Sequence, residues 1–274
     1  MPPVKFDDIP KVSKSILDDD YQVSGYQLVG KQKTNFDGAV STLTVDVLPG
    51  QPVVTPAKVS LKFPKPLGIV GFPIDKLEMD KSGKFKLEVS MSKDMHQVPD
   101  LVIDAKCDPF NLAKATKGLT YSGIKDTLIK VETKPMSPMD FTFEATKTMG
   151  LATVGMKCAG VGTPDLGIRM ASGPYFASLV AKEKLKTFTT NVFYKVSDDL
   201  KLAATYTQGG KASGSYTAGL AYSLAKGTSV KAKIAQDMGV SASVKHEIAK
   251  GMTAIAGCKY AGGKTTYGLK LSLD

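Results

Sequence analysis

The sequence predicts an all-β protein, a single transmembrane β-barrel of about 19 strands. Segments of about ten residues alternate between apolar and polar side chains, and short turns separate them. One face of these segments is rich in Ser, Thr, Gly and Lys, which suits a water-filled interior. Tyrosines gather at segment ends, where a membrane interface favours them. Dividing the roughly 250 residues after the N-terminal segment by about 13 gives on the order of 19 strands.

The composition of the chain excludes several other classes of protein. The chain has 274 residues, 42% of them hydrophobic, and a net charge of +10 in which Arg169 is the only arginine. This apolar content argues against disorder. The apolar stretch at 67–74 falls far short of the roughly 20 residues that a spanning helix needs. Residues 1–20 hold five aspartates, no arginine and no apolar core, so neither a secretory signal nor a cleaved transit peptide is expected.

The clearest alternation lies in the C-terminal half. Strands are expected there at 201–207, 215–224, 229–234, 240–245 and 266–273. Turns are expected at 209–211, 226–227, 237–239, 250–251 and 261–264. Less regular runs lie at 84–91, 141–146 and 187–196. The alternative is a soluble sandwich, which also alternates but usually has fewer strands in two packed sheets.

The N-terminal segment has a different period. An apolar stripe with helical spacing runs through Phe6, Ile9, Val12, Ile16 and Leu17. We therefore expect two parts: an amphipathic helix over residues 1–20, lying in the lumen, and a barrel over residues 21–274. The alternative for the first part is a frayed surface helix.

No motif indicates catalysis or a metal site. The cysteines and histidines lie far apart, without a zinc-ligand spacing: Cys107, Cys158, Cys258, His96 and His246. The run 262–265 resembles the end of a phosphate-binding loop, but the required first glycine is absent. We expect no enzyme, no metal and no cofactor.

The lysines on the Ser/Thr/Gly face indicate the site. These expected pore-lining residues are Lys195, Lys201, Lys231, Lys233, Lys245, Lys259 and Lys270, with Lys86 among the earlier strands. A lysine facing lipid at the midplane costs about 2–4 kcal/mol, which favours the inward register. A cationic wall concentrates anions. With a Debye length of about 8 Å at physiological salt, the selectivity should be modest. The alternatives are a solvated surface and, more weakly, a nucleic-acid footprint, against which the dispersed lysines argue.

Several segments resemble the voltage-dependent anion channel family of mitochondrial porins. They are residues 6–17, the run 228–234, Lys245-His-Glu247 and the ending 267–273, and Asp20-Tyr-Gln22 is similar to plant-type members. The resemblance implies 19 strands with the first and last parallel, and a helix inside the pore. It also implies a voltage-gated, weakly anion-selective channel of the mitochondrial outer membrane that passes ATP, ADP, phosphate and small metabolite anions.

The resemblance also suggests roles and partners. Lys11 matches the family's helix lysine, Lys14 stands where the family has arginine, and Lys231 and Lys233 match its C-terminal signature. Lys11 and Lys14 are the expected movable charges, and all four lysines are expected nucleotide contacts. The expected gating segment comprises Phe6, Ile9, Val12, Ile16, Leu17 and Gly25. Expected partners are membrane lipid, permeating nucleotides and anions, homo-oligomers, and mitochondrial or cytosolic docking proteins; nucleic acid is not expected.

The sequence departs from the family pattern at three places. Pro10 replaces a glycine before the helix lysine, the glycine-rich hinge is reduced to Gly25, and Ala235-Gln236 replaces an Asn pair. The lipid-facing glutamate of some animal members has no clear position in the early strands. Two rival functions stay open: the protein-import pore of the same membrane, which usually has a longer N-terminal extension, and a soluble β-rich ligand-binding protein.

Overall fold

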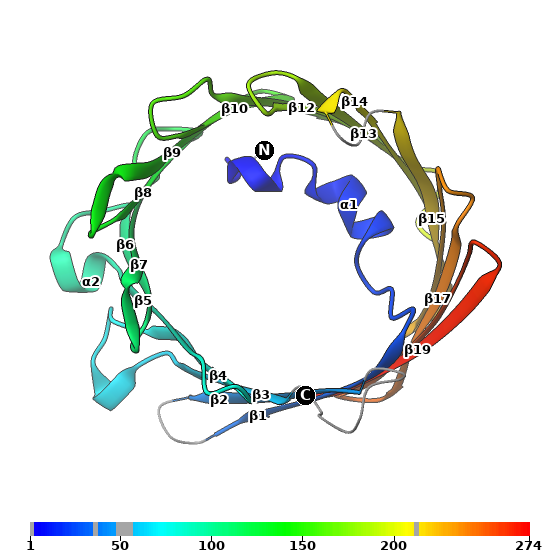
Figure 1. The fold of residues 1–274 in the computed structure, drawn as a ribbon, viewed down its shortest axis with the longest axis horizontal. Coiled ribbons are helices and arrows are strands. Elements are labelled where there is room, and N and C mark those ends of the chain that lie inside the picture. Colours follow the sequence, from blue (N-terminus) through cyan, green and yellow to red (C-terminus); the bar gives the residue numbers. More distant parts are fainter. Residues whose placement is uncertain (1–2, 35–37, 48–56, 211–213) are drawn as a thin grey trace.

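A sheet of 19 strands closes into a barrel in the computed structural model, and the N-terminal segment lies inside the ring (Figure 1). The structure describes residues 3–34, 38–47, 57–210 and 214–274. Strand β1 pairs antiparallel with β2 and parallel with β19, so the ring has no free edge. The predicted fold class is confirmed, including the parallel pairing of the first and last strands. A closed ring is not a two-sheet sandwich, so that alternative is wrong.

The strands follow one another around the barrel in chain order. Their bounds are β1 Gly25–Lys33, β2 Val40–Val47, β3 Ala57–Phe63, β4 Ile74–Asp80, β5 Phe85–Met91, β6 Leu101–Asp108, β7 Asn111–Tyr121, β8 Thr127–Lys134, β9 Ser137–Met149, β10 Ala152–Ala159, β11 Asp165–Ser172, β12 Tyr175–Lys182, β13 Thr187–Lys195, β14 Leu200–Gln208, β15 Ser215–Ala225, β16 Thr228–Ala235, β17 Val240–Ala249, β18 Met252–Ala261 and β19 Lys264–Leu273. The helical elements are η1 Phe6–Asp8, α1 Lys11–Leu17, η2 Pro66–Gly68 and α2 Lys93–His96. No helix within these described ranges is long and apolar enough to cross a membrane.

Contacts with α1 identify the inner face of the wall. Ala203 of β14 packs against Ile16 and Leu17 of the helix. The strand pairing then identifies the inner face on neighbouring strands, because residues that are directly opposite in a sheet point to the same side. Phe193 on β13 and Gly219 on β15 therefore face the lumen with Ala203. Their chain neighbours face outward, since side chains alternate along a strand.

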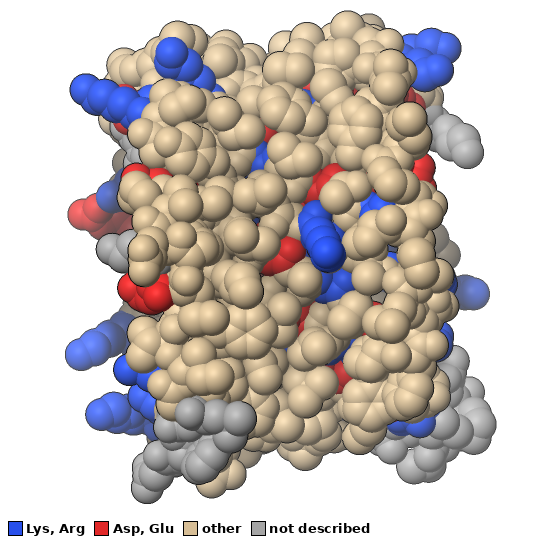
Figure 2. All heavy atoms as spheres, turned by 90° about the vertical axis from the view of Figure 1, so that its left-hand side faces the viewer, with Lys and Arg blue, Asp and Glu red and all other residues tan. Residues whose placement is uncertain are grey.

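The outer face is the apolar one. Large exposed hydrophobic side chains follow the outward register around the barrel, for example Leu28, Leu43, Val192, Leu220, Val244 and Leu269. Figure 2 shows the outside of the wall near β5 and β6; charged side chains gather along its left and right edges, and a smaller group lies near the centre. The register also turns Lys117 and Lys147 outward, so alternation does not place every lysine in the lumen. An apolar outer wall around a polar lumen is the arrangement of a barrel that sits in lipid.

The N-terminal segment forms two short helical pieces instead of the single helix predicted over residues 1–20. The 3-10 turn η1 and helix α1 are separated by Ile9 and Pro10. This break changes which side chains face the wall: Ser13 is fully buried there, while Val12 is only half-buried. Within the predicted stripe, Phe6, Ile9, Ile16 and Leu17 are buried and Val12 is only half-buried, because a continuous helical period does not pass through the turn.

Candidate functional site

The lumen is the candidate site, because a barrel of this many strands is too wide for side chains to fill. Helix α1 lies along the inner surface of β13, β14 and β15 (Figure 1). The segment is attached to the wall at both of its ends, and each attachment combines apolar packing with polar contacts.

Two glycines make room for the first attachment. Phe6 and Ile9 are buried against Val180 of β12. A methyl group added at Gly167 would lie 2.7 Å from Cδ1 of Ile9, and one added at Gly155 would lie 3.0 Å from the same atom. Glycines therefore leave space in the wall where Phe6 and Ile9 pack against it.

Polar contacts hold the same end. The Phe6 amide donates to Glu144 of β9, and the Thr146 hydroxyl donates to the Val4 carbonyl at 2.5 Å. The Lys157 ammonium donates to the Asp7 carboxylate at 2.6 Å. Partial burial opposes the charge on Asp7, but Lys157 outweighs it and holds the pKa of Asp7 below its ordinary value of 3.8. Asp7 is therefore a carboxylate across the physiological pH range.

Two wall lysines hold the other end of the N-terminal segment, at the C-terminus of α1. Lys231 of β16 donates to the Ser15 carbonyl at 2.8 Å and to the Asp19 carbonyl at 3.1 Å, and Lys233 donates to the Leu17 carbonyl. The last carbonyls of a helix have no partner within the helix and carry a partial negative charge, so ammonium groups stabilise them. Lys231 and Lys233 thus cap the C-terminus of α1 instead of standing open to the lumen.

Acidic residues after the helix continue this contact. The Asp20 carboxylate lies 3.3 Å from Lys231 Nζ and 3.4 Å from Lys245 Nζ. Burial opposes its charge, yet Lys231 and Lys245 together lower the pKa of Asp20 below 3.8. The Lys233 ammonium also lies 4.4 Å from the centre of the Tyr21 ring. Burial raises the pKa of Tyr21 to about 12, with Asp18 adding to the shift.

The chain between the helix and β1 lies against the wall. A methyl group added at Gly268 would lie 2.7 Å from the Gln22 carbonyl oxygen. Gly25 has φ 68°, a left-handed conformation that glycine adopts easily. The single remaining glycine of the expected hinge is thus the residue at which the chain turns into the barrel.

Charge is distributed unevenly around the lumen. On β3 to β8, lysines pair with acids on the same wall: Lys58 and Lys76 with Glu78, Lys86 with Glu88, and Lys106 and Lys130 with Glu132. On β14 to β19, the inward lysines include Lys201, Lys231, Lys233, Lys245, Lys259 and Lys270. Within the described ranges, the ion pairs of this second group all go to Asp18 or Asp20 of the N-terminal segment. Excess positive charge is thus concentrated on one half of the wall.

The predicted site residues fall into three groups. Lys201, Lys259 and Lys270 lie on the inner face with no ion pair among the described residues, while Lys86 and Lys195 lie there paired with Glu88 and Asp198. Lys231, Lys233 and Lys245 hold the N-terminal segment. Lys11 and Lys14 are exposed, and Lys11 lies 3.2 Å from Asp8.

Sequence reasoning missed Arg169. This residue is only 7% exposed, and its Nε donates to the Thr153 hydroxyl at 3.2 Å. Together with Lys11 and Lys201 it lines a lumenal cavity of about 470 Å³ between α1 and the wall. Its being the single arginine of a lysine-rich chain was the available signal, because arginine is favoured over lysine where a cation must be buried.

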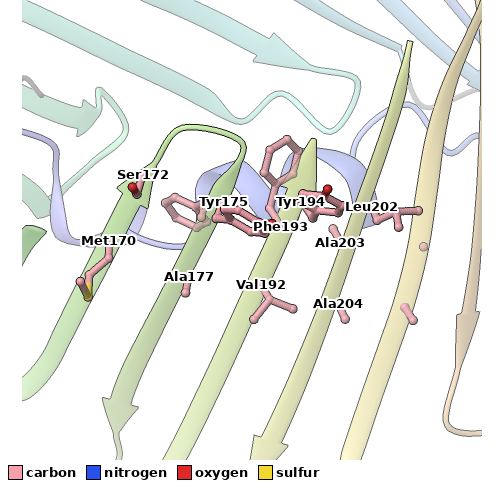
Figure 3. A pocket seen from close by; sticks show the side chains of 13 residues that line it. Met170, Ser172, Tyr175, Ala177, Val192, Phe193, Tyr194, Leu202, Ala203 and Ala204 are labelled. Carbon is pink, nitrogen blue, oxygen red and sulfur yellow. The ribbon is translucent and has the colours of Figure 1, made fainter. Parts of the chain in front are cut away.

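A second cavity lies on the opposite face of the wall. This outer groove of about 630 Å³ crosses β11 to β15. Ala177, Val192 and Ala204 form its floor in one row across neighbouring strands, and Tyr175 stacks on Tyr194 at 4.8 Å along one side (Figure 3). Because these residues point away from the lumen, the groove faces lipid and is not part of the pore.

One part of the barrel matches a known protein family. Residues 152–260 match a family model described as eukaryotic porin, and this segment runs from β10 into β18. No curated protein matches the chain. Two mutants of the porin from Rhodopseudomonas blastica are 10% identical; one matches 73% of this chain and 90% of its own length with a TM-score of 0.47, the other 72% and 90% with 0.49. The matched segment is less than half of the chain, and it makes that part of the closed 19-stranded barrel similar to eukaryotic porins.

Proposed function

We propose that this chain is a porin and a weakly anion-selective channel of the mitochondrial outer membrane, through which ATP, ADP, phosphate and small metabolite anions pass, and that membrane voltage changes its open state. The observation that carries the anion preference is the lysine excess on the inner face of β14 to β19. The opposite half of the wall contributes little net field, because its lysines face carboxylates a few ångströms away.

The magnitude of the preference follows from screening. The Debye length at physiological salt is about 8 Å, so an ion near the pore axis senses the wall lysines only partly. Selectivity for chloride over potassium should therefore be modest, and it should rise as the salt concentration falls. Nucleotides carry several charges, so the same wall favours them more strongly than it favours chloride.

Voltage dependence is supported by the charges on the N-terminal segment. Moving one charge through the full field is worth about 2.3 kcal/mol per 100 mV. Lys11 and Lys14 are exposed cations on a segment outside the sheet, so partial movement of this segment would shift an open–closed equilibrium. Such movement has to break the contacts made by Lys157, Lys231 and Lys233.

Reconstitution in planar bilayers tests the proposal. The purified chain should give large conductance steps, and a salt gradient should give a reversal potential that favours chloride. ATP should leave proteoliposomes loaded with it. A silent bilayer with well-folded protein would contradict the channel, and block by cationic peptides without ATP flux would favour the protein-import pore instead.

A further inference from the structure

The lysines of β16 and β17 surround a carboxylate that belongs to the chain itself. Lys231 and Lys245 approach Asp20 at 3.3 and 3.4 Å, and Lys233 lies 4.0 Å from Asp18. Three ammonium groups on two neighbouring strands, with carboxylates between them, have the composition of a binding site for a multiply charged anion. We define Lys231, Lys233 and Lys245 as the lysine triad.

We propose that the lysine triad is a binding site for phosphate compounds, and that Asp18 and Asp20 occupy it as a built-in competing anion. This inference rests on the proposed anion channel, since it assigns a regulatory site on the wall of that pore. It predicts that phosphate compounds bind poorly while the Asp20 carboxylate is present and bind better when its charge is removed.

The geometry of Asp20 supports its role as an occupant. Its φ of 62° is left-handed, a conformation that costs free energy for a residue with a side chain. The contacts with Lys231 and Lys245 are the ones that hold its carboxylate against the wall. Asp19, the next residue along the chain, is exposed and only its carbonyl meets the triad.

The three lysines differ in how free they are. Lys231 is 12% exposed and also binds two helix carbonyls, and Lys233 binds a third. Lys245 is 44% exposed, and its hydrogen bonds go to Asp20. Lys245 is therefore the member of the triad that an incoming phosphate reaches first, and the one that can be changed without removing the cap of α1.

Asp20→Asn is the central variant, because asparagine keeps the size of the side chain and tolerates the left-handed conformation. Asp19→Asn is its matched control, since it removes the same formal charge one residue away without touching a triad ammonium. Inorganic pyrophosphate is the probe, and calorimetry in detergent micelles measures its dissociation constant. The D20N variant should bind pyrophosphate about two- to fivefold more tightly than the parent chain, the range expected for losing a partly exposed ion pair.

The D19N variant should change the dissociation constant of pyrophosphate only slightly, because the charge that it loses lies away from the triad ammonium groups. Adding Lys245→Gln to D20N should abolish the gain. Equal affinities of D20N and D19N, or a gain that survives K245Q, would overturn the proposal. Protection of Lys14 from trypsin checks that α1 stays docked in each variant.

Bilayer recordings of the parent chain separate this proposal from the channel itself. If the parent is silent while D20N still gains affinity, the channel function fails and the phosphate site stands. If the parent conducts with anion preference while D20N gains nothing, the channel stands and the built-in competitor is wrong.

Discussion

The Lys157 ammonium lies 2.6 Å from a carboxylate oxygen of Asp7, and this ion pair joins the start of the N-terminal segment to strand β10. The two residues are far apart in the sequence, so the contact exists only when the segment lies inside the closed barrel. Asp7 is 61% exposed, which limits the pair to about 0.2–1 kcal/mol. Docking of the segment therefore depends on the sum of several modest contacts.

This ion pair predicts a dependence on acid pH. The pKa of Asp7 is lowered in the folded protein, so its contribution is present above the ordinary value of 3.8 and is lost as pH falls through the lower folded value. Hydrogen-exchange protection of residues 6–9 should fall in that range. Asp7→Asn should remove this part of the pH dependence, whereas Asp8→Asn, whose partner is Lys11 on the same segment, should retain it. A D7N protein with the parental pH profile would refute the assignment.

The glycines under the N-terminal segment predict a packing effect. Gly167→Val places new atoms within 2.7 Å of Ile9 Cδ1, and both Ile9 and Phe6 are buried, so the segment should be displaced at a cost of about 1–3 kcal/mol. Trypsin should then cut faster at Lys5 and Lys11. Gly30→Val is the control, because nothing lies within 4 Å of its added methyl group. Equal cleavage rates in both variants would count against the packing.

The uneven charge of the lumen predicts where selectivity resides. Neutralising Lys259 and Lys270 together should lower the chloride-to-potassium permeability ratio, since neither has an ion pair among the described residues. Neutralising Lys86 and Glu88 together should change it little, because the two charges lie 2.9 Å apart and largely cancel. Reversal potentials in a salt gradient measure both, and equal effects would contradict the asymmetry.

Charge reversal on the helix addresses the permeation path. Replacing Lys11 and Lys14 with glutamate changes the lumenal charge by four units, so anion preference and ATP flux should fall and voltage dependence should flatten. Deleting residues 1–20 should enlarge or destabilise the open state. If selectivity, flux and gating all survive the double replacement, these two lysines do not lie in the path.

The buried hydroxyl of Tyr21 predicts that one substitution leaves the protein equally stable or more stable. This hydroxyl has no hydrogen-bond partner among the residues that the structure describes, and the ring of Tyr21 lies under Lys233. Tyr21→Phe keeps the ring and removes the unpaired hydroxyl, so thermal stability should stay equal or rise. Because burial disfavours the ionised phenolate, the folded protein keeps its full stability below pH 10.0 and loses stability as pH rises toward a pKa of about 12, and Y21F should lack this loss. A clearly less stable Y21F would show that the hydroxyl has a partner.

The alternation of apolar and polar residues predicted most of the fold. It did not predict contacts between residues that are far apart in the sequence. Lys231 and Lys233 lie on the Ser/Thr/Gly face of the wall, because a two-residue period fixes the side to which each residue points. Their contacts with helix carbonyls join residues more than 200 positions apart, which a local pattern does not contain. The burial of Ser13 in place of Val12 against the wall has a local cause, since Pro10 and the 3-10 turn shift the phase of the helix.

The parallel pairing of β1 with β19 also governs when the barrel can form. Residues 25–30 of β1 bond to residues 268–273 of β19, so the ring cannot close before β19 has been synthesised. Until then, one edge of β1 presents unpaired backbone groups, which are costly in lipid and promote aggregation in water. Closure of this seam therefore requires every strand from β1 to β19, and the emerging chain needs protection of the β1 edge until β19 has been made.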